Sequence, residues 1–232
     1  MPKRIKMKGP LIPNNSQEAY DYFGLEAVSA KSITDAFPED NSDIVLEVNS
    51  NGGLVTVGSE IYTALKSYPG NVTVEVTGMA ASAASVIAMA GDTVEISPTA
   101  QIMIHNVSSG VYGDHNALEH EAVVLKGFNK SIASAYVHKT GKALNDLLEL
   151  MNQTTWFDAE AAVENGFADK VMFAQEVAPL LVASETPMIP QDFIERMQAT
   201  MTPDVDKIAE LVAQKLAEHE PEKEKTENVF CH

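Results

Sequence analysis

The chain has 232 residues, 45% of them hydrophobic, which can form one large domain or a domain of about 170 residues with an appendage. Its 33 acidic and 16 basic residues give a net charge of −17, which argues against nucleic-acid binding because such binding needs a basic surface. No segment reaches the roughly 18 apolar residues of a membrane span, and the basic first residues lead into no hydrophobic signal region. The lone Cys231 excludes an intramolecular disulfide. We therefore expect a cytoplasmic protein that binds neither nucleic acid nor a membrane.

The first elements follow from local patterns. Ile5 and Met7 indicate a strand near the start, and Ser29 can cap a short helix that stops before Pro38. Residues 44–48 then predict a buried strand because they are almost continuously apolar.

That strand runs into residues 49–53, which read N-S-N-G-G, and a helical pattern of Val57, Ile61 and Leu65 follows. Main-chain N–H groups can line an anion site where a strand ends in paired glycines before a helix. Asn-Gly-Gly is also a common turn. This segment alone does not decide between the two interpretations.

Residues 72–91 organise the rest of the chain. Alternating valines predict a strand over 72–77, a break at Gly78 and then a buried helix of small and apolar residues over 79–89. Ser82 is expected in the first turn of that helix, where unpaired N–H groups favour a developing negative charge, as a nucleophile requires. A serine among alanines is also often a packing residue that bonds a carbonyl one turn back, and this interpretation suits Ser85.

Two successive units of strand, glycine turn and helix predict an α/β fold whose glycine turns meet at one edge of the sheet. Two short strands follow, over 92–96 and 101–105, and His105 ends the second. A histidine at a strand end can be a hydrogen-bonded structural residue or a general base, and both remain open.

The apolar spacing over 116–139 predicts a helix of about 35 Å, longer than a domain of this size needs to cover its own sheet. We expect it to protrude and to pack against another subunit. His115 and His120 lie five residues apart and do not share a helix face, so no metal site is predicted there.

The next predicted elements are a helix over 144–151 and a strand over 154–157. Asp158 is placed to cap a helix over 159–165, and a final strand is expected over 168–173.

The sequence pattern changes after residue 175, because prolines at 179, 187 and 190 interrupt the chain. We therefore predict two domains, the first over 1–175 and an acidic C-terminal extension over 176–232. The extension is predicted to hold two amphipathic helices, near 193–201 and 205–216, and a charged, disordered segment over 218–228.

Four motifs, in order, resemble the Clp protease proteolytic subunit (ClpP) family. N-S-N-G-G at 49–53 is similar to the family's N-S-P-G-G, and G-M-A-A-S at 78–82 is similar to its nucleophile segment. A-Q-I-M-I-H-N at 100–106 resembles the strand that delivers its histidine, and residues 156–171 resemble its last helix and strand. The resemblance covers residues 5–173.

The resemblance implies a crotonase-like spiral of β-β-α units with a protruding long helix, assembled into stacked rings. It implies a serine endopeptidase in which Ser82 is the nucleophile and His105 the general base. The N–H groups of Gly53 and Ala83 match the oxyanion-hole positions, and Thr154 stands at the position of the third triad member.

Thr154 is a departure, because the family has an acid there. A threonine can accept a hydrogen bond from the imidazole but cannot offset the imidazolium charge. Asp158 is a nearby carboxylate, but the capping role fits it better. Asn51, in place of the family's proline, is a milder departure.

The acidic tail, Trp156 and the altered acid position resemble more closely the ClpP-like head maturation proteases of tailed bacteriophages. This likeness implies a homo-oligomer in the bacterial host cytoplasm or within the prohead that processes capsid or scaffold protein. The sequence contains no P-loop, so ATP-driven unfolding would need a separate ATPase partner, and no cofactor or metal is expected. The alternatives are a crotonase-type acyl-CoA enzyme and a catalytically weak ring that acts as an assembly scaffold.

Overall fold

The fold is described from a computed structural model that defines residues 1–174 and residue 194. The helices and the disordered segment predicted for the C-terminal extension lie outside the described residues. Within those residues, seven strands form one sheet: β1 (Lys3–Lys8), β2 (Ile44–Ser50), β3 (Val72–Ala81), β4 (Thr93–Ile96), β5 (Gln101–Ile104), β6 (Thr155–Phe157) and β7 (Lys170–Val171). The helices are η1 (Asn14–Ser16), α1 (Gln17–Tyr22), α2 (Ala30–Thr34), α3 (Val55–Lys66), α4 (Ala83–Ala88), α5 (His115–Thr140), α6 (Leu144–Asn152) and α7 (Ala159–Glu164).

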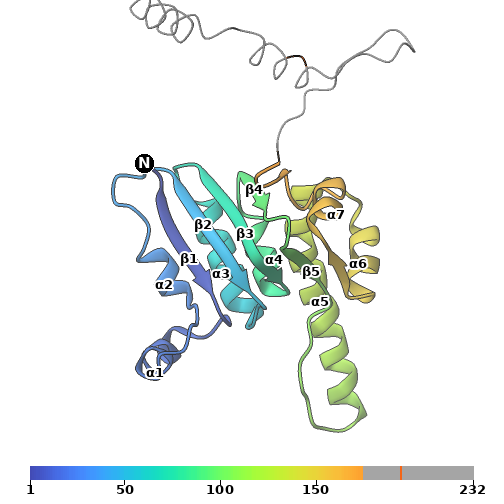
Figure 1. Cartoon of the computed structure of the whole chain (residues 1–232). Coiled ribbons are helices and arrows are strands. Elements are labelled where there is room, and N and C mark those ends of the chain that lie inside the picture. The colour runs from blue at the N-terminus through green and yellow to red at the C-terminus, as the bar shows by residue number, and fades with distance from the viewer. Residues whose placement is uncertain (175–193, 195–232) are drawn as a thin grey trace, which may run out of the picture. The chain divides into compact units, whose positions relative to one another are not determined.

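The predicted α/β fold is confirmed (Figure 1). The main path of the sheet runs β1-β2-β3-β4-β7 with every neighbouring pair parallel, while β5 and β6 branch from β3 and form the one antiparallel pair among the described strands. Parallel strands need helical crossovers, and α3 and α4 supply two of them.

The predicted break of the strand at Gly78 is wrong, because β3 continues to Ala81. A Cβ on residue 78 would lie 2.6 Å from Oδ1 of Asn49, so the glycine marks a close approach to β2. Before it, β3 pairs with β4 through Thr73–Val76, and after it β3 pairs with β5 through Met79–Ala81. The extra length of β3 brings its last residues beside β5. His105 directly follows β5.

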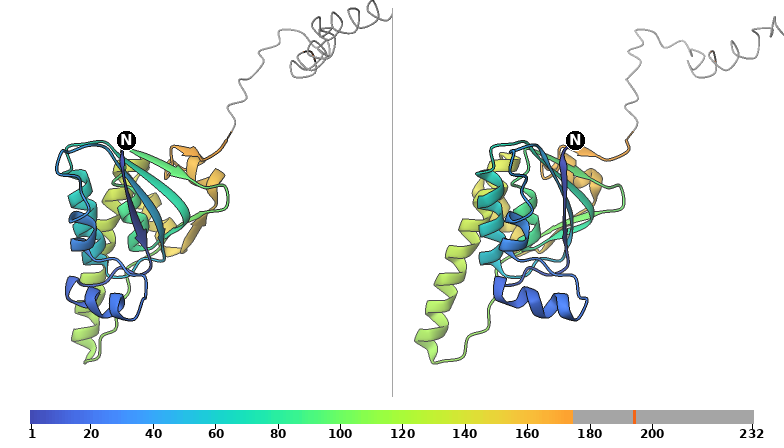
Figure 2. Two further views of the ribbon diagram at one scale, coloured as in Figure 1. Left: turned by 60° about the vertical axis from the view of Figure 1, so that its left-hand side comes forward. Right: turned by 90° about the vertical axis from the view of Figure 1, so that its left-hand side faces the viewer.

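Helices α3 and α4 and the C-terminal part of α5 lie on one face of the sheet (Figure 2). The alternation predicted for the start of β3 is confirmed, and it places Val72, Val74 and Val76 against these helices. The buried members of this core include Met7, Leu46, Val74, Ile61 and Ile87. The other face carries charged side chains, among them Arg4, which bonds Glu47 at 2.6 Å and also pairs with Glu75.

Helix α5 protrudes from this body, as predicted (Figure 1). Asp114 caps its start and Gly141, at φ 70°, ends it. Its buried residues are Ile132, Ala133, Ala135 and Tyr136, all in its C-terminal half. Only that half belongs to the core, so the N-terminal turns extend beyond the sheet.

The two predicted helix caps are confirmed: Ser29 accepts from Ser32 N–H, and Asp158 accepts from Ala161 N–H. The final strand is shorter than predicted, and η1 and α1 were not predicted, because neither has a buried residue to give an apolar pattern. None of the helices in the described part of the chain has the length and hydrophobicity needed to cross a bilayer.

Candidate active site

Ser82 lies at the turn between β3 and α4. Its backbone has φ 57° and ψ −128°, a conformation rare for a residue with a side chain. Its N–H donates to the Met103 carbonyl at 2.9 Å, which ties the turn to β5. The helix begins at Ala83 and not at residue 79 as predicted, so Ser82 is the N-cap residue of α4.

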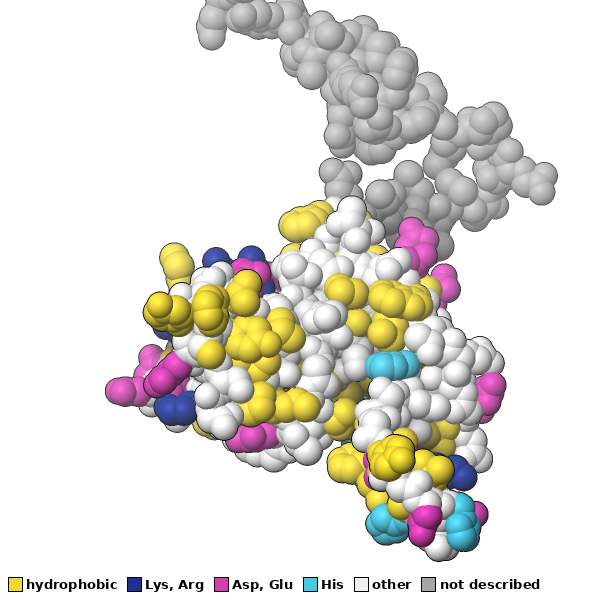
Figure 3. Space-filling model, turned by 90° about the horizontal axis from the view of Figure 1, so that it is seen from below, with side chains coloured by type: hydrophobic (Ala, Val, Ile, Leu, Met, Phe, Trp, Pro, Cys, Tyr) yellow, Lys and Arg dark blue, Asp and Glu magenta, His cyan; other side chains and the backbone are white. Residues whose placement is uncertain are grey.

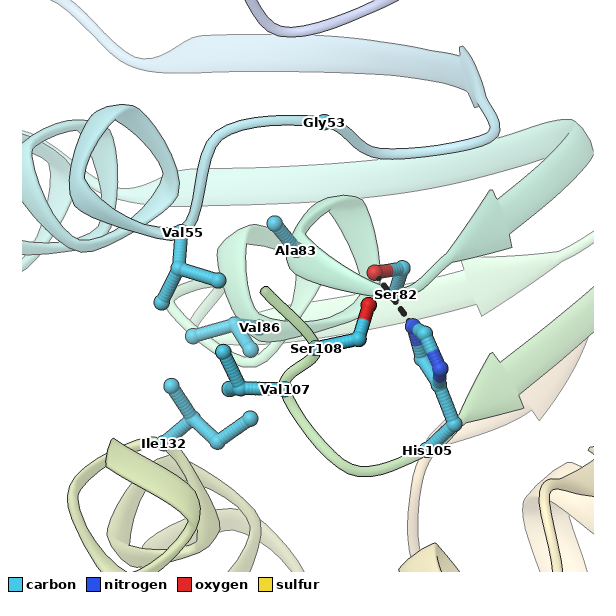
Figure 4. Close-up of a pocket in the computed structure, with 9 residues that line it drawn as sticks. All are labelled: Gly53, Val55, Ser82, Ala83, Val86, His105, Val107, Ser108 and Ile132. Carbon is cyan, nitrogen blue, oxygen red and sulfur yellow. Dashed lines mark hydrogen bonds between the residues drawn. The ribbon is translucent and has the colours of Figure 1, made fainter. Parts of the chain in front are cut away.

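His105 follows the last residue of β5 and reaches Ser82. The parallel register pairs Ala81 with Met103, so the residues just beyond these two lie at the same edge of the sheet. The Nε2 of His105 is 2.7 Å from the Oγ of Ser82 (Figure 4). This distance is a normal hydrogen bond, so the hydroxyl can donate to an imidazole whose proton is on Nδ1.

The segment after His105 is anchored by side-chain amides. Asn106 Nδ2 donates to Asn152 Oδ1 at 2.7 Å, and Val107 N–H donates to Asn129 Oδ1 at 2.8 Å. Since Asn152 ends α6 and Asn129 lies on α5, two helices fix the backbone that carries the imidazole.

The two glycines that follow β2 lie in close contacts: Gly52 packs against the Ser82 turn and Gly53 packs against Leu11. A Cβ on Gly52, at φ 88°, would lie 2.6 Å from the Ala81 carbonyl and 2.9 Å from the Ala83 nitrogen. A Cβ on Gly53, at φ 149°, would lie 2.5 Å from the Leu11 carbonyl. Both positions therefore need glycine, both for conformation and for close approach.

The Gly53 and Ala83 N–H groups are available to a ligand. Ala83 is the first residue of α4, where an N–H has no partner within the helix. In the part of the chain that the structure describes, no carbonyl or side chain accepts a hydrogen bond from either N–H. Two such donors beside a hydroxyl can stabilise an oxyanion.

Ser82, His105, Gly53 and Ala83 line one cavity of about 70 Å³. The remaining wall residues are Val55, Val86, Val107, Ser108 and Ile132. They come from α3, α4, the loop after β5, and α5 (Figure 4). The wall beside the serine is thus mainly aliphatic. The sequence did not indicate these wall residues, because they are spread over four segments with no common spacing.

Thr154 does not line this cavity. Its side chain is exposed, its backbone is at φ 52°, and its N–H donates to the Met151 carbonyl at 3.1 Å. Among the described residues, no hydrogen bond joins Thr154 to His105, and no carboxylate is hydrogen-bonded to His105. Asp158 is engaged as the cap of α7, where it accepts from Ala161 N–H at 2.8 Å.

Ser85 is the packing serine that the sequence predicted. It is fully buried and its hydroxyl donates to the Ser82 carbonyl at 2.6 Å. Ser82 differs, because its own hydroxyl meets an imidazole at a cavity. The geometry of Ser82, His105 and the N–H groups of Gly53 and Ala83 suits acyl transfer through a tetrahedral intermediate.

Comparisons with known proteins agree with this chemistry. The family model described as Clp protease matches residues 29–175. Proteolytic subunit 1 of the ATP-dependent Clp protease of Leifsonia xyli subsp. xyli is 28% identical over 146 residues, which cover 62% of this chain and 74% of that protein. Subunit 2 from Tropheryma whipplei is 28% identical over 156 residues, covering 66% of this chain and 87% of that protein. Subunit 1 from Streptomyces avermitilis is 30% identical over 154 residues, covering 66% of this chain and 71% of that protein.

Proposed function

The chain belongs to the Clp protease family and is a serine endopeptidase with the ClpP/crotonase-like fold, and on this premise we propose that Ser82 and His105 carry its chemistry. The observation that supports the assignment most strongly is the 2.7 Å hydrogen bond between the Oγ of Ser82 and the Nε2 of His105. Ser82 Oγ attacks the scissile carbonyl while His105 takes its proton. His105 then returns the proton to the leaving amine, and a water hydrolyses the acyl-enzyme.

The N–H groups of Gly53 and Ala83 form the oxyanion hole. They line the cavity beside Ser82, where the substrate carbonyl oxygen becomes negative. A well-aimed donor in such a site contributes about 3–4 kcal/mol to the stability of the transition state. Both donors belong to the backbone, so the conformations of the Gly52 and Ser82 turns set their positions.

The third triad position stays a prediction at Thr154. Its exposed side chain makes no hydrogen bond to His105 among the described residues, so the support for this role is the sequence resemblance alone. The proposed mechanism therefore depends on the serine–histidine pair and the backbone donors.

The aliphatic cavity receives a substrate side chain next to the scissile bond, because Ser82 and His105 line the same cavity. Its volume of about 70 Å³ is less than half of the roughly 150 Å³ that accommodates benzene in an apolar protein cavity. Small aliphatic side chains fit this space better than aromatic or charged ones.

The enzyme works as a homo-oligomeric compartment of stacked rings. The protruding turns of α5 support this proposal, because Leu118, Val123 and Phe128 on this helix are exposed. Figure 3 shows hydrophobic side chains on the face of the molecule seen from below. Exposed apolar side chains on a protruding helix are suited to contact another subunit. Mass spectrometry of the intact assembly tests this proposal, since a monomeric native mass would contradict it.

The substrate that we propose is capsid or scaffold protein of a tailed bacteriophage, processed during head maturation in the bacterial cytoplasm or within the prohead. The acidic extension, Trp156 and the threonine at 154 support this assignment through resemblance. The relatives named above are subunits of ATP-dependent proteases, and a separate ATPase partner would supply any unfolding here. Co-expression with the capsid and scaffold proteins encoded beside it tests the assignment: cleavage is expected with the wild type and not with Ser82→Ala, and equal behaviour of the two would refute it.

Covalent labelling of Ser82 by a fluorophosphonate is expected of the peptidase and not of a crotonase-type acyl-CoA enzyme, which would use a similar pair of backbone donors but would not need the bonded Ser82 and His105. A catalytically weak ring that acts as an assembly scaffold would retain head assembly after Ser82→Ala, whereas the proposed protease would lose it.

A further inference from the structure

The carbonyl of Ser82 is held by a buried hydrogen-bond network that the reaction itself does not use. The Ser85 hydroxyl donates to this carbonyl at 2.6 Å, and the Ser85 N–H donates to it at 3.0 Å. The Ser85 Oγ also lies 2.8 Å from the hydroxyl of Tyr136 on α5. Ser85 and Tyr136 are 0% and 1% exposed, so bulk water does not compete for these bonds.

The direction of each bond in this network is fixed. A serine hydroxyl has one proton, and Ser85 gives it to a carbonyl, which can only accept. Tyr136 must therefore be the donor to Ser85 Oγ. Burial raises the pKa of Tyr136 far above its ordinary value, so its hydroxyl stays protonated and neutral.

The Ser82 carbonyl shares a peptide plane with the Ala83 N–H. In a trans peptide these two groups point in opposite directions within one plane, so fixing the carbonyl also fixes the direction of the N–H. The plane needs such support, because Ser82 is held at φ 57° and ψ −128°. A backbone in a sparsely populated region is strained and persists only where its surroundings hold it.

We propose that Ser85 and Tyr136 are positioning residues that aim the Ala83 N–H at the oxyanion. The inference rests on the proposed function, in which that N–H is an oxyanion donor. Neither residue lines the cavity, whereas Ala83 and Val86 on the same helix do. Ser85 and Tyr136 therefore act through the Ser82–Ala83 peptide and do not touch the substrate.

Two substitutions in the full-length chain test this role, with kcat and KM measured on a chromogenic peptide. Ser85→Ala removes the hydroxyl that donates to the Ser82 carbonyl. This variant is expected to lower kcat about tenfold, which is less than the roughly 10²–10³-fold loss when an oxyanion donor is removed. KM is expected to stay unchanged, because the oxyanion exists only after the attack. Tyr136→Phe leaves the Ser85 hydroxyl in place and is expected to lower kcat by a smaller factor.

The double variant distinguishes a network from two separate packing effects. If Tyr136 acts only through Ser85, then Tyr136→Phe has no further effect on kcat in the Ser85→Ala background. A matched control is Tyr68→Phe, because the Tyr68 hydroxyl donates to the Ser42 carbonyl at 2.6 Å. This control loses a comparable bond and some stability but is expected to keep the wild-type kcat.

All rates are measured at a temperature where thermal unfolding shows each variant to be folded. If Ser85→Ala does not fold, Tyr136→Phe alone is used for the test. A wild-type kcat in Ser85→Ala would overturn the inference, and so would a wild-type kcat in Tyr136→Phe where only that variant is tested. An equal effect of Tyr136→Phe on kcat in the wild-type and Ser85→Ala backgrounds would also overturn it. Failure of the proposed function looks different: a fluorophosphonate would then not label Ser82 of the wild type, and the inference would fall with it.

Discussion

The backbone of Gly52 lies so close to the Ser82 turn that a Cβ on residue 52 would be 2.8 Å from the Cβ of Ser82. The end of β2 and the start of α4 therefore fit together only if residue 52 has no side chain. This contact links two segments that the sequence marked separately, the paired glycines and the Ala-Ala-Ser turn.

Gly52→Ala is expected to abolish activity and to destabilise the fold. The new methyl group must displace the Ala81 carbonyl oxygen, the Ser82 Cβ and the Ala83 nitrogen, which lie 2.6–2.9 Å away, and residue 52 also has φ 88°. Peptidase activity and thermal unfolding measure the two effects.

Gly24→Ala is the matched control. Gly24 also has a positive φ, of 66°, but a Cβ there would meet nothing within 4 Å. It should lose about 1 kcal/mol of unfolding free energy through backbone strain and keep its activity. Equal activity in the two variants would show that close packing at Gly52 is not required by the site.

Thr154→Val is expected to change kcat by less than about twofold, since an interaction that is absent contributes nothing to the transition state. The reason is that the exposed Thr154 makes no hydrogen bond to His105 among the described residues. Steady-state kinetics on a peptide substrate measures it. A loss of tenfold or more would instead identify the threonine hydroxyl as the group that orients the imidazole.

Asp158→Ala separates a helix cap from a catalytic acid. Because its carboxylate accepts from Ala161 N–H at 2.8 Å, the substitution should lower the unfolding free energy by about 1 kcal/mol. The expected kcat at a temperature where the variant is folded is that of the wild type. Asp158→Asn should retain more of the stability, since asparagine is also a good cap. A large fall in kcat with an intact melting temperature would contradict the capping role.

The central elements of the site were predictable because their signals are local. The alternation of β3, the small residues of α4 and the histidine at the end of β5 each follow from a few neighbouring residues. The proximity of Ser82 and His105 was expected from family resemblance, and the structure places them 2.7 Å apart. The pattern does not explain why these two residues meet. They meet because β3 continues past Gly78 and changes its partner strand from β4 to β5.

The features missed by the sequence depend on long-range packing or lack a pattern. The sequence pattern predicts a strand break at Gly78, but this glycine instead leaves room for the Asn49 side chain. Helix α1 buries no residue, so it has no apolar face to detect. The cavity wall combines valines from separate segments, and only the fold brings them together.

Val55→Ala is expected to widen the cavity and to shift peptide preference toward larger aliphatic side chains next to the scissile bond. Val55 lines the cavity at the start of α3, whereas Val57 in the same helix is 7% exposed and does not. Val57→Ala should therefore lower stability by about 1–3 kcal/mol without changing the preference. Relative kcat/KM values for alanine, valine, leucine and phenylalanine substrates measure the shift. An identical preference profile in both variants would remove this cavity from substrate recognition.

The most direct test of the account is the intact mass of the full-length chain after incubation with a fluorophosphonate probe. The proposed pair predicts one adduct per chain, located on Ser82 by peptide mapping. The adduct is absent in Ser82→Ala, and it forms at least 10³-fold more slowly in His105→Gln, because removal of a catalytic base leaves only the effects of binding and the oxyanion hole. An unlabelled wild-type chain, or a labelling rate unaffected by His105→Gln, would contradict the assignment of these two residues.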